Sequence, residues 1–379
     1  MKDKIPNWKA ILVLSITPAL TAVLLPLYAY YVGFSIADWL TFSVFMILTG
    51  LSITAGYHRL WSHKTYSTNL FFRVLYMLFG SAALQNSVFK WASDHRKHHI
   101  HVDDNNKDPY SASRGFIYSH IGWMLFKNRK SEVYDNINDL KKDKILRFQH
   151  KYYPVIALFM CFGIPALIGW SYGSILGCVL LAGLLRLVLN HHFTFFINSL
   201  AHIIGSRPYS TKNSARDNPL LSLVTYGEGY HNFHHKFAGD YRNGVKWYDF
   251  DPSKWIIALS SKFGWAWNLK ITPKPIIENA KLQVQYQKFQ DKESCYPKQI
   301  MLLKEKLETQ YQHFSKSISD WSKAYTEWVE GKKTRLPKDH IHNLRNKYLH
   351  FKNIVQNEKK AWKEALEQFS ITTKKPYKL

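Results

Sequence analysis

Four stretches of uncharged, mainly apolar residues dominate the hydropathy pattern of the chain. They cover residues 11–32, 39–57, 153–170 and 174–197. An α-helix of about 20 residues, rising about 1.5 Å per residue, spans the roughly 30 Å hydrocarbon core of a bilayer. A signal peptide does not explain the first stretch, which is too long and lacks a small-residue cleavage site. The pattern predicts an all-α integral membrane protein with four transmembrane helices.

Lysine and arginine are distributed unevenly around these stretches. The short links that follow residues 32 and 170 carry none, whereas the N-terminus, residues 58–152 and the chain after Asn198 are basic. Because cytoplasmic loops are enriched in lysine and arginine, both termini and both large polar segments are expected in the cytoplasm. The expected location is a bacterial inner membrane, or the endoplasmic reticulum if the source is eukaryotic.

Three shorter apolar segments are predicted not to cross. Residues 74–84 form a short run that Arg73 closely precedes, which favours a re-entrant or interfacial helix over a fifth span. Residues 116–126 and 255–267 are expected at the membrane surface, with tryptophans as headgroup anchors.

Histidines gather in four places along the polar segments. Nine of the 18 histidines stand in GYHRLWSH, DHRKHH, NSLAH and GEGYHNFHH, as His58, His63, His95, His98, His99, His202, His231, His234 and His235. Spacings of three and four residues place imidazoles on one helical face. Neutral imidazole suits iron, copper, zinc and nickel, whereas structural zinc sites often include cysteine. The set predicts a two-metal redox site that handles dioxygen.

The span count and the metal site depend on each other. His58 follows the second stretch, and the second histidine cluster lies between the second and third. If residues 74–84 do not cross, all nine histidines lie at one membrane face. If they crossed, the bilayer would separate the first two clusters.

At these motifs the sequence resembles the membrane-bound acyl-CoA Δ9 desaturases, the stearoyl-CoA desaturase-like family. The resemblance covers roughly residues 8–270, and NHHFTFF at 190–196 looks more like bacterial members than animal ones. The matching stretches are ITAGYHRLWSHKTY (53–66), QNSVFKWASDHRKHHIHVD (85–103), NSLAHIIGSRPY (198–209) and GEGYHNFHHKF (227–237).

The resemblance implies a cofactor and a reaction. It implies two iron ions (Fe2+/Fe3+) ligated by the nine histidines, with Asn198 contacting one iron through water. It also implies insertion of a cis double bond into a saturated acyl chain, with O2 as co-substrate and two electrons from an external donor. The division of ligands between the two irons stays open.

Two groups of residues are substrate candidates. Met46, Gly50, Thr54 and His58 form an i, i+4 row leading from the metal end toward the bilayer, where the family places the closed end of its acyl tunnel. Met46 and Gly50 are expected to limit chain length, with ordinary helix packing as the alternative. Gln85, Asn86, Trp91 and Asp94 match family positions near the CoA or the bend of the chain. Ser93 stands where animal enzymes carry arginine, which leaves acyl carrier protein or an intact lipid as alternatives to acyl-CoA.

The C-terminal part differs from the rest of the chain. Residues 1–270 are expected to form the membrane desaturase domain, and residues 271–379 a basic helical extension. Leu307, Tyr311, Phe314, Ile318, Trp321, Tyr325 and Trp328 recur at heptad spacing, and an amphipathic stretch follows from about His340 to Phe369. The pattern predicts a helical hairpin interrupted at Gly331 and Pro337, as a stabilising appendage or a docking module.

The net charge and the motifs of the sequence bear on its binding partners and its electron donor. The formal net charge is +24, but four spans and the absence of a recognisable nucleic-acid module argue against nucleic-acid binding. No His-Pro-Gly-Gly haem motif occurs, so a separate electron donor is expected, such as ferredoxin, cytochrome b5 or an oxidoreductase, and the basic face suits an acidic carrier. The alternatives are a His-box fatty acyl hydroxylase or alkane monooxygenase, and a non-catalytic metal-binding membrane protein.

Overall fold

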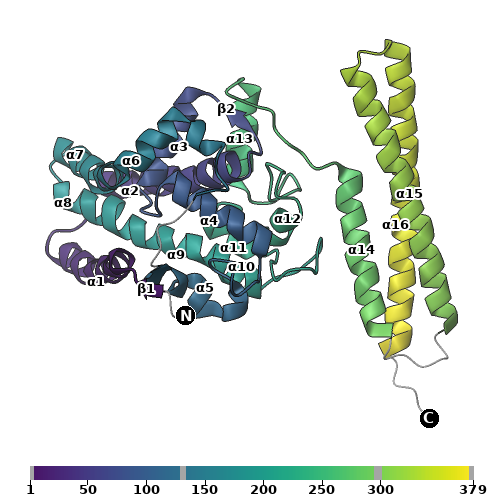
Figure 1. The fold of residues 1–379 in the computed structure, drawn as a ribbon, viewed down its shortest axis with the longest axis horizontal. Helices are drawn as coiled ribbons and strands as arrows, with labels where there is room; N and C mark the ends of the chain where they lie inside the picture. The colour runs from purple at the N-terminus through teal and green to yellow at the C-terminus, as the bar shows by residue number, and fades with distance from the viewer. Residues whose placement is uncertain (1–3, 129–133, 294–300, 375–379) are drawn as a thin grey trace. The chain divides into compact units, whose positions relative to one another are not determined.

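A computed structural model describes residues 4–128, 134–293 and 301–374. The chain is almost entirely helical and divides into two compact units (Figure 1). The first unit consists of Met1–Arg207 and Lys212–Ile271, and the second of Pro208–Thr211 and Thr272–Leu379. The apolar stretches and all nine clustered histidines belong to the first unit.

Four helices of the first unit are long and apolar enough to cross a membrane. They are Trp8–Tyr31, Ile36–Ser62, Lys144–Ser171 and Ile175–Ile203, so the predicted four-span, all-α fold is confirmed by length and composition. The first is α1 (Trp8–Tyr31), and the others are built from consecutive segments. These are α2 (Ile36–Leu51) and η1 (Ser52–Ser62); α6 (Lys144–Leu158), η5 (Phe159–Gly163) and α7 (Ile164–Ser171); and α8 (Ile175–Cys178), η6 (Val179–Leu185), α9 (Arg186–Asn198) and α10 (Leu200–Ile203).

The surface of α1 is apolar in a way that fits lipid rather than water. None of its residues, all of which the structure describes, is fully buried, and Pro18 and Pro26 lie inside the helix. The side chains of Leu12, Val23 and Leu27 are about half exposed. Water-soluble monomers rarely leave so long an apolar surface uncovered, whereas a bilayer covers it with hydrocarbon.

The short apolar helix α3 (Leu70–Ser81) does not have the length of a span. Its 12 residues extend about 18 Å, well short of a roughly 30 Å hydrocarbon core. One face is buried through Phe72, Tyr76 and Met77. The prediction that this segment does not cross agrees with its length.

Short elements complete the first unit beside the spans. The helical ones are α4 (Val88–His101), η2 (Ala112–Arg114), α5 (Phe116–His120), η3 (Gly122–Leu125), η4 (Leu140–Lys142), α11 (Pro219–Val224), α12 (His231–Lys236) and α13 (Pro252–Lys262). Strand β1 (Lys4–Pro6) pairs antiparallel with β3 (Phe126–Asn128), and β2 (Ser67–Thr68) pairs with β4 (Ala266–Trp267). These two pairings connect segments that lie far apart in the sequence.

Arg96 fixes α4 against the end of the second span. Its guanidinium donates to the main-chain oxygens of Trp61 (2.8 Å) and Ser62 (3.0 Å), and it makes two hydrogen bonds to the carboxylate of Asp139 (2.8 and 3.0 Å). A two-point arginine–carboxylate contact restricts orientation more than a single contact does. The tie holds the first two histidine clusters side by side.

Among the described residues, the second unit contains the predicted hairpin and one further helix before it. These helices are α14 (Lys274–Glu293), α15 (Met301–Lys333) and α16 (Lys338–Lys374), and α15 and α16 run side by side (Figure 1). The predicted seam is buried at Leu307, Phe314, Ile318 and Trp321, where it packs against residues of α16. The heptad pattern does not predict α14, because Ala280, Leu282, Val284 and Tyr286 alternate with polar residues instead of recurring at helical spacing.

Gly331 does not interrupt α15, contrary to the expectation. The helix continues to Lys333, and the break before α16 contains Pro337. A Cβ at Gly331 would lie 2.8 Å from a methyl carbon of Leu344, so this glycine permits close approach of the two helices. Its role is packing rather than termination.

Trp362 is the residue whose loss we expect to weaken the second unit most. Its side chain is almost completely buried, and its indole N–H donates to Gln285 of α14 at 2.8 Å. The Trp362→Ala substitution should cost about 3–5 kcal/mol of unfolding free energy, because it opens a cavity and leaves an amide oxygen unpaired. Limited proteolysis of the whole protein should cut the 272–379 region much faster. The exposed Lys360→Ala is the control, and equal resistance of both variants would contradict the prediction.

Candidate metal centre

The first histidine pair lies on a stretch with unusual helical geometry. In an α-helix, residues five apart point about 140° away from each other. The η1 segment is instead a π-helix, in which the His63 main-chain N–H donates to the His58 carbonyl at 3.1 Å. Bonds of this i to i+5 type bring His58 and His63 to one face, and π segments occur frequently at functional sites. Sequence periodicity predicts an ordinary helix here and misses this feature.

The other clusters lie on ordinary helices that face this segment. His95, His98 and His99 occupy the last two turns of α4, and His202 lies on the short helix α10. His231, His234 and His235 lie on α12. In both triads the spacing of three and four residues places the rings on one face, as the sequence predicts.

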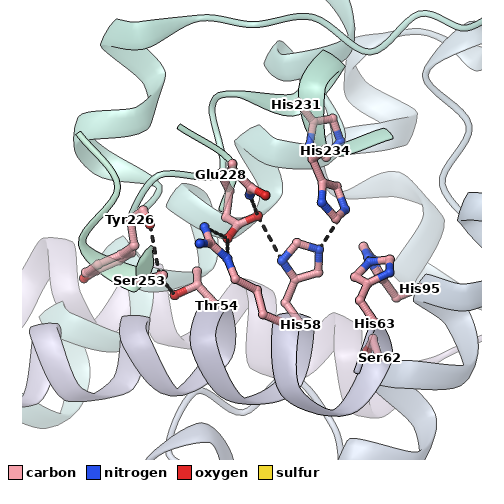
Figure 2. A network of polar contacts seen from close by, with 12 residues as sticks. Thr54, His58, Ser62, His63, His95, Tyr226, Glu228, His231, His234 and Ser253 are labelled. Carbon is pink, nitrogen blue, oxygen red and sulfur yellow. Dashed lines mark hydrogen bonds and ion pairs between the residues drawn. The ribbon is translucent and has the colours of Figure 1, made fainter. Parts of the chain in front are cut away.

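The nine imidazoles form two groups, and this grouping shows which histidines lie together. One group is His58, His63, His95, His99 and His234, and the other is His98, His202, His231 and His235; within each group the ligand atoms lie within 4.8 Å of one another. Figure 2 shows His58, His63, His95 and His234 turned toward a common point. The structure therefore brings together every histidine of the four motifs.

Spacings between ring nitrogens fit metal ligation. The Nε2 atoms of His58 and His234 are 3.0 Å apart, those of His63 and His95 2.7 Å, and those of His202 and His231 3.1 Å. Two ligands about 2.1 Å from one ion and at right angles to each other are about 3 Å apart. The geometry matches ligand sets arranged around two ions.

Carboxylates lie beside the Nδ1 atoms of His58 and His98, whose Nε2 atoms face other histidines of the cluster. His58 Nδ1 lies 2.9 Å from Glu228, and His98 Nδ1 lies 2.9 Å from Asp108. A neutral imidazole has one N–H, and donating it to a carboxylate leaves a lone pair on Nε2. Nε2 lone pairs directed into the cluster are the donors that metal ions take from neutral histidine. The donor set thus fits metal ions.

The electrostatics of the cluster keep several of its rings neutral. Burial lowers the pKa of His95 well below its ordinary value, and repulsion from His58 and His99 lowers that pKa further. The same two causes, burial first, lower the pKa values of His63, His99, His231, His234 and His235. Neutral imidazole is the form that binds metals, so the site is prepared for ligation at physiological pH.

Glu228 links the first group to a buried charge network. It accepts hydrogen bonds from Arg59 at 2.9 Å and from the Asn243 amide at 2.6 Å, in addition to its contact with His58 (Figure 2). Burial raises the pKa of this carboxyl, but His58 and Arg59 outweigh it and lower the pKa to about 2. Arg59 also pairs with Asp251 at 3.0 Å. Glu228 is therefore an anion that orients His58.

The second group has a comparable outer layer. Asp108 also accepts the main-chain N–H groups of Asp103 and Tyr110, both at 3.1 Å, which fixes the carboxylate that holds His98. His202 Nδ1 contacts the Ser214 hydroxyl at 2.7 Å, and that hydroxyl donates to Asp103 at 2.5 Å. Sequence reasoning missed these residues, although the acidic run after the second cluster and the Glu in GEGYHN were signals.

The family comparison agrees with this geometry. Residues 34–265, more than half of the chain, match the family described as "Fatty acid desaturase". The chain belongs to the fatty acid desaturase family.

Curated members of this family are similar over the same region. The chain is 45% identical over 256 residues to "Acyl-CoA desaturase 1" of Saccharomyces cerevisiae, covering 67% of this chain and 50% of that protein. It is 43% identical over 251 residues to "Probable acyl-CoA desaturase" of Schizosaccharomyces pombe, covering 66% and 52%. It is 38% identical over 241 residues to human "Stearoyl-CoA desaturase 5", covering 62% and 73%. The chain thus spans about half the length of the yeast relatives.

Asn198 lies near the smaller histidine group along the chain. It is the last residue of α9, four residues before His202, whose ring belongs to the group of four histidines. The other group holds five histidines.

Two of the predicted substrate residues form a hydrogen-bonded chain next to the cluster. The Trp91 indole N–H donates to Gln85 at 3.3 Å, and the Gln85 amide donates to the Thr194 hydroxyl at 2.9 Å. The Trp91 ring stacks on His95 with centroids 5.0 Å apart. Thr194 escaped the sequence reasoning because a lone threonine in an apolar span carries no signal.

The remaining substrate candidates separate into two places. Asn86 is exposed and its main-chain N–H donates to the Tyr153 hydroxyl at 2.9 Å, while Asp94 pairs with Lys90 at 3.0 Å. Gly50 and Thr54 line a cavity of about 10 Å³ between the second and fourth spans, beside Met46. Thr194, which accepts the Gln85 hydrogen bond, lines the same cavity as Gly50 and Thr54.

Arg186 in the fourth span satisfies its charge without a carboxylate among the described residues. Its guanidinium is fully buried and donates to the main-chain oxygens of Ala182 (2.9 Å) and Ala82 (2.7 Å) and to Cys161 Sγ (3.2 Å). An ionisable side chain inside a span normally faces the bundle interior, as this one does. It connects the fourth span to the third and to the segment after α3.

Proposed function

We propose that this chain is a fatty acyl desaturase that introduces a cis double bond, at the Δ9 position, into a saturated acyl-CoA. The observation that carries the proposal is the convergence of nine imidazoles in two groups at the end of a membrane bundle. An unactivated methylene has no acidic proton, so no carboxylate or imidazole base can remove one. The reaction therefore requires redox chemistry at a metal site.

Two iron ions are the proposed cofactor. The five-histidine group holds one and the four-histidine group the other, with Asn198 contacting the second through water. When bound, the iron pair supplies reduction of dioxygen and removal of one hydrogen from each of two adjacent methylenes. The overall balance takes one O2, two electrons and two protons and yields the alkene and two waters.

The protein supplies position and a dry environment. Glu228 and Asp108 hold His58 and His98 by their Nδ1 atoms, which fixes ring orientation. Gln85, Trp91 and Thr194 form a continuous wall beside the first group, and we propose that the acyl chain bends along it. Asn86 and Asp94 are proposed to lie near the head group, while Met46, Gly50 and Thr54 lie toward the chain end.

The partners follow from the composition of the chain. Acyl-CoA is the proposed substrate because the relatives are acyl-CoA desaturases, with acyl carrier protein or an intact lipid as the alternative carriers. We propose electron delivery by a carrier such as ferredoxin, cytochrome b5 or an oxidoreductase. Attraction between its acidic surface and the basic face of the chain would speed their association.

Charge also supports an orientation in the membrane. The segments beyond both long-helix hairpins are basic, whereas the links inside the hairpins carry no lysine or arginine. We therefore propose that the metal site and both termini face the cytoplasm.

Fatty-acid profiling in a host that lacks its own desaturase tests the activity. Wild-type protein, supplied with a suitable reductant, should yield a monounsaturated acid that vector-only cells lack, and mass spectrometry of the product gives the bond position. A hydroxy acid would favour the hydroxylase alternative. A preparation that binds iron but gives no new lipid with any of the three classes of electron donor would contradict the proposal.

A further inference from the structure

We propose that Tyr110 is a positioning residue shared by the two histidine groups, whose hydroxyl orients His95 and whose ring supports His98. The inference rests on the proposed two-iron site of the desaturase. It concerns a residue outside the four histidine motifs, on the loop between α4 and η2.

The Tyr110 hydroxyl lies at the outward-facing nitrogen of His95. Nδ1 of His95 is 3.2 Å from this hydroxyl, whereas Nε2 of the same ring lies 2.7 Å from Nε2 of His63, inside the group of five histidines. A neutral imidazole has a single N–H. When Nε2 is directed at a metal ion, that N–H is on Nδ1, and the hydroxyl oxygen accepts it. The contact therefore favours the tautomer of His95 that presents a lone pair to the cluster.

The ring of the same tyrosine contacts a histidine of the other group. The ring centroids of Tyr110 and His98 are 4.5 Å apart, with 31° between the ring planes. The main-chain N–H of Tyr110 also donates at 3.1 Å to Asp108, whose carboxylate lies 2.9 Å from His98 Nδ1. His95 belongs to the group of five histidines and His98 to the group of four. Tyr110 thus contacts one ligand of each group, through its hydroxyl in the first and its ring in the second.

Tyr110 is itself held firmly in place. Its side chain is only 5% exposed, and its ring packs against Trp123 with centroids 5.0 Å apart. Side chains that are packed and anchored in this way keep one rotamer, and such residues hold ligands within the narrow range of geometry that a metal site needs. The hydroxyl is therefore a fixed reference point for the ring of His95.

Each histidine group has one charged and one neutral outer partner at Nδ1 among the described contacts. The pairs are His58 with Glu228 and His95 with Tyr110 in the group of five, and His98 with Asp108 and His202 with Ser214 in the group of four. A carboxylate adds negative charge beside its ligand, whereas a hydroxyl orients the ring without adding charge. Loss of the Tyr110 hydroxyl should therefore disturb the geometry of one group and leave the charge of the site unchanged.

Metal binding tests the assignment independently of catalysis. Tyr110→Phe removes only the hydroxyl and keeps the ring that packs on His98. Tyr118→Phe is the matched control, because its hydroxyl donates to the carbonyl of Pro109, the residue before Tyr110, at 3.2 Å. The whole protein is purified in detergent, loaded with Fe2+ without oxygen and dialysed against a graded chelator series. Iron per chain gives the affinity for each ion, and Mössbauer spectra show which ion remains.

His98→Ala supplies the reference spectrum, since it should keep only the ion in the group of five. Tyr110→Phe should release one ion at a chelator concentration about 10–100-fold lower than wild type does, and hold the other at wild-type affinity. The ion that it holds should give a spectrum different from that of His98→Ala, because the two groups differ in their number of histidines. Tyr118→Phe should bind both ions as wild type does.

Unchanged retention of both ions in Tyr110→Phe, equal weakening of both, or loss of the ion that His98→Ala lacks would overturn the assignment. A purely structural role of Tyr110 would give the second of these results together with a lower melting temperature. Failure of wild type to bind two ions would instead overturn the metal site on which the assignment rests. Wild type that binds two ions but forms no unsaturated product would overturn the desaturase function and leave the role of Tyr110 standing.

Discussion

Replacing His98 with alanine is expected to abolish desaturation. His98 supplies one of the four ring nitrogens of the second group, and its Nε2 lies 3.2 Å from that of His235. Loss of a residue that only orients a ligand typically costs about 10–100-fold in metal affinity or activity, so loss of a ligand should cost more than about 100-fold. Purified His98→Ala should also contain about one iron per chain where wild type contains about two. Whole-cell lipid profiling and elemental analysis of the same preparation measure both effects.

His101 provides the matched control for this experiment. It lies on the same helix, α4, three residues after His98, and belongs to neither histidine group. His101→Ala should keep both the iron content and the product of wild type. Equal losses in the two variants would mean that α4 simply fails to fold without its histidines, and normal iron in His98→Ala would refute its role as a ligand.

The Glu228→Gln substitution should reduce iron affinity and desaturase activity by about 10–100-fold while leaving all nine histidines in place. Glutamine keeps the shape of the side chain but removes the negative charge that holds His58 at 2.9 Å. Its amide can also present an N–H to His58 Nδ1, which favours the wrong tautomer. Iron retained after dialysis against a graded chelator series measures the change.

Asp251→Asn separates this effect from a loss of stability. Asp251 and Glu228 both pair with Arg59, but only Glu228 touches His58. Each substitution should cost about 1–3 kcal/mol of stability, because each weakens a buried charged contact. Asp251→Asn should therefore lower the melting temperature and keep wild-type iron affinity. If the two variants lost iron in parallel, Glu228 would be acting on stability alone.

The transmembrane helices could be predicted from the sequence because they depend on interactions between residues close together in the chain. A run of about 20 apolar residues must satisfy its backbone hydrogen bonds internally, so residues 11–32 and 153–170 allow few structures other than helices. The same holds for spacing: His95, His98 and His99 face one way because three and four residues are about one helical turn. Family motifs then added the metal and the reaction, which no periodicity contains.

In the C-terminal helical extension, some features depend on contacts between distant residues and could not be predicted from local sequence patterns. The heptad at Leu307, Phe314 and Trp321 predicts α15, but α14 is stabilised by contacts such as that between Gln285 and Trp362, which lie 77 positions apart. Gly331 reads as a helix breaker, yet in the structure it is a contact point for Leu344. In both cases the deciding partner is distant in sequence.

By itself the sequence determined the four spans, the helix faces and the identity of the nine histidines, since each depends on residues within one or two turns. Only the tertiary structure decided the division into groups of five and four, the π-helix that aligns His58 with His63, and the anchoring by Glu228 and Asp108. It also decided that Tyr226 fills the space beside Gly50, 176 positions away in the chain. The physical reason is that ligand sharing and steric closure depend on distances between separate helices, which packing sets and local periodicity does not.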